Sequence, residues 1–178
     1  MSLDAAVADL LPGSPASIFF AALFVGCMIA AAVYDLASYT IPNFLSVLLL
    51  AGFVALGVWQ SLAWGQLGDH LSAGMVLLAA GWALFALGIV GGGDAKFMAA
   101  TGVWIGWSAM PSYILAFSLA GGVLVLLLLL FRRLPLPGPI RGFAWIAALH
   151  NPANGVPYGV ALAAGGVAIA PHLAILAG

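Results

Sequence analysis

Long, uninterrupted apolar runs limit how this chain folds more than any other feature of its sequence. A helix of about 20 apolar residues is long enough to cross the hydrocarbon core of a bilayer. Only 5% of the 178 residues are Asp, Glu, Lys or Arg, whereas soluble domains carry roughly 25% charged residues. So few charges cannot cover the surface of a soluble domain of this size, so most of the surface must face lipid.

The apolar runs predict six membrane-spanning helices. The run over 95–131 is too long for one span, and we expect a break at Met110–Ser112, because proline disfavours helix in the residue before it and starts a new helix well. Residues 143–150 fit a short interfacial helix. The predicted fold class is an all-α integral membrane protein, a six-transmembrane-helix bundle forming one membrane-embedded domain over 1–178. The predicted spans are 17–34, 44–59, 71–90, 95–109, 112–131 and 156–176.

The charged residues divide between the two ends of these predicted helices. Every Lys and Arg falls in the loops that follow the first, third and fifth spans: Lys96, Arg132, Arg133 and Arg141. Three acidic residues fall on the opposite side: Asp4, Asp9 and Asp69. The positive-inside rule therefore predicts cytoplasmic basic loops, with both termini outside. A net charge of −1 gives no indication of a nucleic-acid partner.

The remaining two acidic residues, Asp35 and Asp94, stand at span ends on the basic side. Taken singly, each has a structural explanation: a helix-end charge at the interface for Asp35, and a helix N-cap for Asp94. Taken together they predict a reaction site, because two neighbouring carboxylates cannot both ionise easily. One then serves as a base and the other as an acid, which is what a water-activating peptidase needs.

Residues beside Asp94 are candidates for binding a substrate. Gly91, Gly92 and Gly93 permit positive φ angles and close backbone approach, so an extended peptide could lie against them; a tight turn between helices is the alternative. Lys96 would assist at the site or anchor the helix at the interface. No His and Asp residues have metal-ligand spacing, so no metal or other cofactor is expected.

Three segments of the sequence resemble one family. GGGDAKF, containing Asp94, matches the GxGD motif of membrane aspartyl proteases. YDLASYTIPN, containing Asp35, is similar to the first-aspartate motif of type IV prepilin peptidases, and VPYGVALAAG is similar to their proline–aromatic–glycine segment. The resemblance extends from the first predicted helix to the last, and it implies that Asp35 and Asp94 are the catalytic aspartates.

The same resemblance implies an endopeptidase of the bacterial cytoplasmic membrane. Such enzymes remove a short positive leader from prepilins or pseudopilins at the cytoplasmic face. Larger members also methylate the new N-terminus, using S-adenosylmethionine and a domain between their first two helices. Only a short loop without cysteine separates the first two predicted helices here. The chain therefore resembles the peptidase-only members, including those of Flp/Tad pili, and no methyltransferase activity is expected.

Two other classes of protein are alternatives to a peptidase. A small ion-coupled transporter component would use the paired Asp residues to bind a cation or proton, but transporters place such residues near the midplane, often within inverted repeats. A non-catalytic assembly factor would leave Asp35 and Asp94 replaceable. Cleavage of a prepilin by the native protein and by Asp→Asn variants separates these classes.

Overall fold

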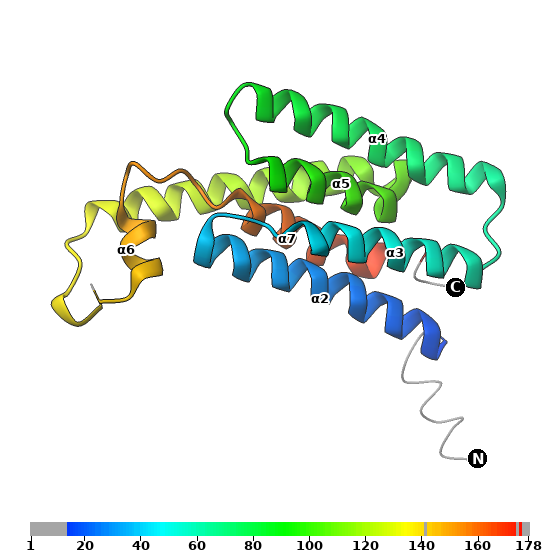
Figure 1. Cartoon of the computed structure of the whole chain (residues 1–178), viewed down its shortest axis with the longest axis horizontal. Helices are drawn as coiled ribbons and strands as arrows, with labels where there is room; N and C mark the ends of the chain where they lie inside the picture. Colours follow the sequence, from blue (N-terminus) through cyan, green and yellow to red (C-terminus); the bar gives the residue numbers. More distant parts are fainter. Residues whose placement is uncertain (1–13, 141, 174, 176–178) are drawn as a thin grey trace, which may run out of the picture.

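The computed structural model of the chain describes residues 14–140, 142–173 and 175. These residues form helices and connecting loops, with no strand among them (Figure 1). Two 3-10 turns accompany the α-helices, η1 (Gly138–Ile140) and η2 (Ala170–His172). The α-helices are α2 (Pro15–Ser38), α3 (Asn43–Trp59), α4 (Trp64–Ala86), α5 (Gly92–Arg133), α6 (Ala144–His150) and α7 (Tyr158–Ile169).

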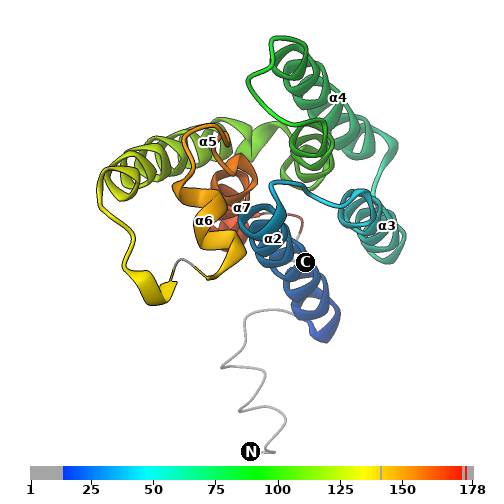
Figure 2. The same ribbon diagram turned by 60° about the vertical axis from the view of Figure 1, so that its left-hand side comes forward.

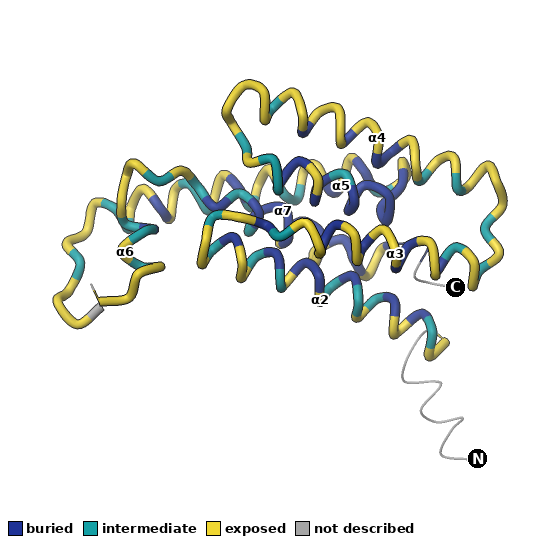
Figure 3. Tube along the Cα trace, viewed as in Figure 1, coloured by how far each residue is buried: buried dark blue, intermediate teal, exposed yellow. Residues whose placement is uncertain are grey.

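Three of these helices, α2, α4 and α5, are long and apolar enough to cross a membrane. Two shorter apolar helices, α3 and α7 with its continuation in η2, lie among them. Large apolar side chains are exposed on the outward faces, as with Phe19, Val54 and Leu119, which are 63%, 62% and 63% exposed, while the buried positions line the inside of the bundle (Figure 3). The predicted all-α membrane fold is confirmed.

The break in the long apolar run occurs at Gly106, about one turn earlier than predicted. Gly106 has φ 61° and ψ −174°, a conformation that is essentially restricted to glycine. The chain reverses there, so the two halves of α5 run in opposite directions (Figures 1 and 2). Pro111 lies inside the second half and ends no helix. The prediction of a break at Met110–Ser112 was therefore wrong, although the division into two helical segments was right.

His70 supports this break from α4. Carbonyl groups at a helix end lack their usual helical partners, and His70 Nδ1 donates to the carbonyl oxygen of Val103 at 2.8 Å. The His70 ring also packs against Gly106, where an added Cβ would lie 3.0 Å from it. Two residues therefore stabilise the break: Gly106 adopts its backbone conformation, and His70 pairs the Val103 carbonyl that has lost its helical partner.

The two halves of α5 form the centre of the bundle. The first half packs on α3 and α4, which lie on either side of it, and the second half packs on α7 (Figure 2). Trp104 is fully buried in the first half and donates through Nε1 to the carbonyl oxygen of Leu49 in α3, at 2.8 Å. Helix α2 covers the remaining side and contacts both α3 and α7.

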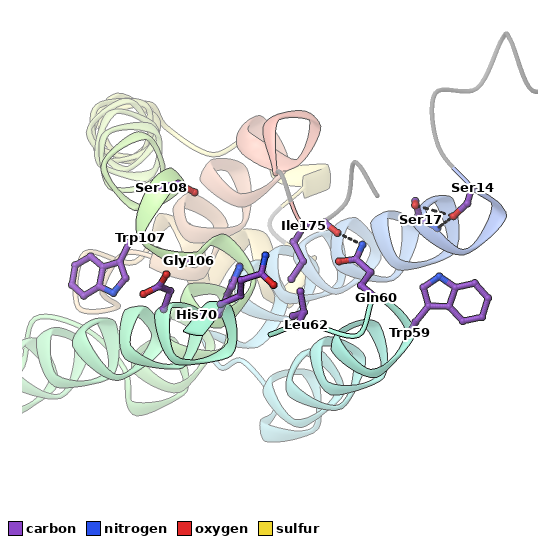
Figure 4. Close-up of a pocket in the computed structure, with 12 residues that line it drawn as sticks. Ser14, Ser17, Trp59, Gln60, Leu62, His70, Gly106, Trp107, Ser108 and Ile175 are labelled. Carbon is purple, nitrogen blue, oxygen red and sulfur yellow. Dashed lines mark hydrogen bonds between the residues drawn. The ribbon is translucent and has the colours of Figure 1, made fainter. Parts of the chain in front are cut away.

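The described basic residues lie near the two ends of α5, which are at the same end of the bundle because the helix reverses at Gly106 (Figure 1). Lys96 Nζ donates to Asn43 Oδ1 at 3.1 Å, and Arg132 Nη2 donates to the carbonyl oxygen of Asn154 at 2.8 Å. Asp69 lies at the opposite end, in the cavity of Figure 4. Arg141, Asp4 and Asp9 lie outside the described residues. The placement of the basic residues at one end and of Asp69 at the other agrees with six spans. The side of the membrane that each end faces stays a prediction.

Two predicted boundaries need correction. Helix α4 begins at Trp64 rather than at residue 71, because a capping pair, the Gln66 side chain on the Ala63 N–H at 3.0 Å, starts the helix within a polar stretch. It ends at Ala86, just before Gly88, which has φ 72°. The last helix begins at Tyr158 and continues through η2 to His172; Leu176 of the predicted span lies outside the described residues.

Candidate active site

Asp35 is a buried carboxylate near the end of α2, with only 2% of its surface exposed. Its Oδ2 accepts a hydrogen bond of 2.6 Å from the N–H of Gly159. Gly159 is the second residue of α7, where backbone N–H groups have no partner within the helix and the helix dipole favours a negative charge. A Cβ at Gly159 would lie 2.9 Å from the same oxygen, so this close approach requires glycine.

Asp94 is the third residue of α5 and is 9% exposed. Its Oδ2 accepts a hydrogen bond of 3.0 Å from the N–H of Gly91, the N-cap of the helix. The sequence offers Asp94 as the N-cap of the helix, and this alternative is wrong: Gly91 is the N-cap, and Asp94 lies three residues later. Asp94 still caps α5 by reaching back to Gly91. Its carboxylate therefore lies at a helix N-terminus, as the Asp35 carboxylate does at α7, and negative charge is favoured there.

Ile41 joins the two carboxylate environments. It lies in the four-residue loop between α2 and α3. A Cβ at Gly93 would lie 2.9 Å from the Ile41 carbonyl oxygen, and a Cβ at Gly159 would lie 2.6 Å from Ile41 Cδ1. The loop thus lies between the N-termini of α5 and α7, and it brings Asp35 and Asp94 close enough to interact electrostatically. The three motif segments therefore meet at one place.

The glycines before Asp94 act differently from what the sequence suggested. None of Gly91, Gly92 and Gly93 has a positive φ, and the last two belong to α5. Only Gly93 is required by close packing, against the backbone of Ile41. Gly91 is exposed, so it is the member of the triplet that an extended peptide would reach. Their role in substrate binding stays a prediction.

Lys96 is exposed and hydrogen-bonded to Asn43, with no contact to Asp94 recorded among the described residues. The two side chains lie at one end of an apolar groove of about 630 Å³ between α3, α4 and α5. Val47, Met75 and Ala99 are among its lining residues. The geometry therefore separates Lys96 from the carboxylates and associates it with this groove.

A small cavity of about 150 Å³ lies beside Asp94. Its lining is otherwise apolar and includes Met98, Phe117 and Tyr158. A water molecule in the liquid occupies about 30 Å³, so this space is large enough for water at the carboxylate. Water next to a buried carboxylate is what acid–base hydrolysis requires.

A second polar region lies at the opposite end of the bundle. A cavity of about 720 Å³ is lined there by Gln60, Asp69, His70 and Trp107, among others (Figure 4). It holds a single carboxylate, and its histidine is already paired with Val103. Within the described part of the chain, no group of three or more His, Cys, Asp or Glu side chains could hold a metal ion.

The sequence alone assigns no individual role to Ile41 and Gly159, which lie at the carboxylates, or to Arg132, which binds three backbone carbonyls before α7. Ile41 and Gly159 were visible as parts of the quoted motifs, in TIPN and PYGV. Arg132 was considered only as a loop charge. No local pattern identified it, because its partners lie 17 to 23 positions along the chain.

The structure is that of an all-helical membrane protein with two buried carboxylates, each bound by a backbone N–H at a helix N-terminus. The sequence model of the type IV leader peptidase family matches residues 22–126, more than half of the chain, including both aspartates. The chain therefore belongs to the type IV leader peptidase family.

Curated relatives agree with this assignment. A prepilin leader peptidase/N-methyltransferase of Aeromonas hydrophila is 35% identical over 141 residues, which are 72% of this chain and 48% of the relative. The protein of the same name from Dickeya chrysanthemi is 30% identical over 139 residues, 71% of this chain and 47% of the relative. The chain spans about half the length of the curated relatives it matches. No solved structure matches it.

Proposed function

We propose that this protein is a prepilin peptidase that uses Asp35 and Asp94 to hydrolyse one peptide bond of its substrate. The observation that carries the proposal is the meeting of two buried carboxylates, 59 positions apart in the sequence, around Ile41. Their separate helix N-termini offset part of the repulsion between two negative groups. Family membership and the curated relatives' names support a leader peptide as the substrate.

The proposed chemistry needs one ionised and one protonated carboxyl group. The ionised group takes a proton from a water molecule as the water oxygen bonds to the scissile carbonyl carbon. The protonated group donates its proton to the carbonyl oxygen. When the tetrahedral intermediate collapses, the C–N bond breaks and the carboxyl group that took the water proton gives it to the leaving nitrogen. The other carboxylate takes a proton from a hydroxyl group of the intermediate as the carbonyl re-forms, so the pair again holds one proton.

The proposed setting is the bacterial cytoplasmic membrane, with the site at the cytoplasmic face. The supporting observation is that the site shares an end with Lys96 and Arg132, since basic loops are retained in the cytoplasm. Gly91, Gly92, Gly93 and Lys96 would contact the prepilin or pseudopilin, and lipid would surround the bundle. Both termini would lie outside.

We further propose a single peptidase domain over 1–178, without methyltransferase activity, as in the short Flp/Tad-type members. The support is the connection from α2 to α3, which consists of Tyr39, Thr40, Ile41 and Pro42 alone. It leaves no room for an inserted domain between these helices. The transporter alternative is not favoured, because both aspartates lie at helix ends rather than at mid-span.

The test is cleavage of a purified prepilin in liposomes by the native protein and by Asp35→Asn, Asp94→Asn and Asp69→Asn. The first two variants should lose cleavage and the third should keep it, because Asp69 lies at the opposite end of the bundle. EDTA should leave the rate unchanged, since carboxylates rather than a metal activate the water. Cleavage that survives in either of the first two variants contradicts the two-aspartate site.

A further inference from the structure

The side chain of Arg132, at the end of α5, lies against the connection between α6 and α7. Its Nε donates to the carbonyl oxygen of Leu149 at 2.8 Å. Its Nη2 donates to the carbonyl oxygens of Asn154 at 2.8 Å and of Gly155 at 2.9 Å. One guanidinium therefore binds three backbone carbonyls of the segment 149–155.

Arginine suits this position better than any other side chain. Its planar group presents five donors in a fixed geometry and keeps its charge. The carbonyl of Leu149 belongs to the last turn of α6, where carbonyls lack helical partners and favour a nearby cation. Hydrogen bonds from a charged donor are also the stronger ones. The contacts of Arg132 thus fix the course of a segment without regular structure.

Tyr39 ties the last turn of α6, where this segment begins, to α2. Its hydroxyl donates to the carbonyl oxygen of Ala148 at 3.3 Å, which also accepts from Asn154 Nδ2 at 2.8 Å. Arg132 lies close to the Tyr39 hydroxyl group. The N–H of Tyr39 in turn donates to the carbonyl oxygen of Asp35 at 2.8 Å. The segment held by Arg132 is therefore connected to the helix end that carries Asp35.

The segment leads directly into α7, and its position decides where the first residues of that helix lie. Pro157 is the N-cap of α7 and is fully buried. Two residues later, the N–H of Gly159 donates to Asp35 Oδ2. A shift of the segment would move this donor relative to the carboxylate.

We propose that Arg132 is a positioning residue, which holds the segment 149–155 so that the N-terminus of α7 presents the Gly159 N–H to Asp35. Its effect on cleavage rests on the proposed function, whereas its effect on the Asp35 carboxyl group does not. Arg133 is the natural comparison, because it is the adjacent residue, has the same charge and is exposed.

The experiment compares Arg132→Gln, Arg132→Lys and the control Arg133→Gln in purified, membrane-reconstituted protein. The first readout is the carboxyl region of the infrared spectrum, with the Asp35 band identified by its loss in Asp35→Asn. The second is kcat and KM for prepilin cleavage. Arg132→Gln should shift the Asp35 band and lower kcat by about ten- to a hundredfold at little changed KM, because small displacements of reacting groups have effects of this size.

Arg132→Lys should lie between the native protein and Arg132→Gln, since one ammonium cannot bind three carbonyls in the same geometry. Arg133→Gln should match the native protein in both readouts. An unshifted Asp35 band in Arg132→Gln overturns the proposal, whether or not kcat falls. If Arg132→Gln does not fold, the band in Arg132→Lys decides in the same way. A shifted band in a protein that cleaves no prepilin leaves the positioning role standing and contradicts the proposed function instead.

Discussion

Both ends of this helix bundle hold acidic side chains, which are buried at one end and exposed at the other. At one end Asp35 and Asp94 are buried, and each accepts a backbone N–H from a helix N-terminus. At the other end Asp69 is exposed and lines an open cavity, and His70 pairs with a backbone carbonyl. The first end buries two carboxylates beside a small cavity, whereas at the second end His70 supports the turn at Gly106.

The comparison also shows what makes a polar group in a membrane bundle a candidate for catalysis. The larger cavity is at the end with the single carboxylate, and the cavity beside Asp94 is small. Size therefore does not identify the site. The burial of two neighbouring ionisable groups identifies the candidate site instead. Such burial costs stability, so it is expected mainly where a reaction needs it.

The largest expected effect follows from removing one carboxylate at the site end. Asp35→Asn or Asp94→Asn should lower kcat for prepilin cleavage by at least about a thousandfold, as removal of a catalytic group commonly does. Asp69→Asn should change it less than about twofold, since substitutions far from a site are usually nearly neutral. Single-turnover cleavage measures both, and a loss in Asp69→Asn that equals the other two would remove the distinction between the ends.

The next effect concerns close packing around Asp35. In Gly159→Ala the new methyl group would meet Ile41 Cδ1 and Asp35 Oδ2 at 2.6 and 2.9 Å. Displacement of these groups should lower kcat by about a hundredfold. Gly122→Ala is the matched control, because nothing lies within 4 Å of its added Cβ. Equal activity of the two variants would contradict a tight approach of α7 to Asp35.

The corresponding change at the other end should affect stability rather than chemistry. Gly106→Ala places a side chain at φ 61°, close to the His70 ring, and such backbone strain costs about 1–3 kcal/mol. Denaturant unfolding in detergent measures the loss, with Gly122→Ala again as the control. The folded fraction should retain a near-native kcat. A fall in kcat as large as that of Gly159→Ala would show that the two ends are coupled.

The sequence predicts the helices well, because their apolar runs are longer than any of the loops. Runs of this length are stable in lipid as membrane-spanning helices. It misplaces the break in α5 because proline is a visible signal, whereas Gly106 is one of 23 glycines. Gly106 has a positive φ and packs against His70, which lies 36 positions away in the sequence. Three-dimensional packing, not local propensity, decided this turn.

The candidate site shows the same difference between local sequence signals and three-dimensional packing. The motifs around Asp35 and Asp94 are local and could be identified, as could their shared end of the bundle. The donor to Asp35 could not, because Gly159 lies 124 positions away and reaches it only through the packing of α2 on α7. Lys96 is near Asp94 in sequence, yet two positions are about half a turn of helix, and its side chain is directed towards Asn43.

The smallest expected effect tests Lys96 as a substrate-binding residue. Lys96 is exposed and its hydrogen bond to Asn43 is accessible to solvent, so its removal should cost little stability. If its ammonium contacts the substrate at the end of the apolar groove, Lys96→Met should raise KM by about three- to tenfold and leave kcat unchanged, the signature of lost uniform binding. Arg133→Met serves as the charge control, because it removes one positive charge from the same end of the bundle.

An equal rise in KM in both variants would indicate a general electrostatic effect. An unchanged KM in Lys96→Met would remove Lys96 from the substrate site and leave it an interfacial anchor, with the chemistry confined to the buried pair.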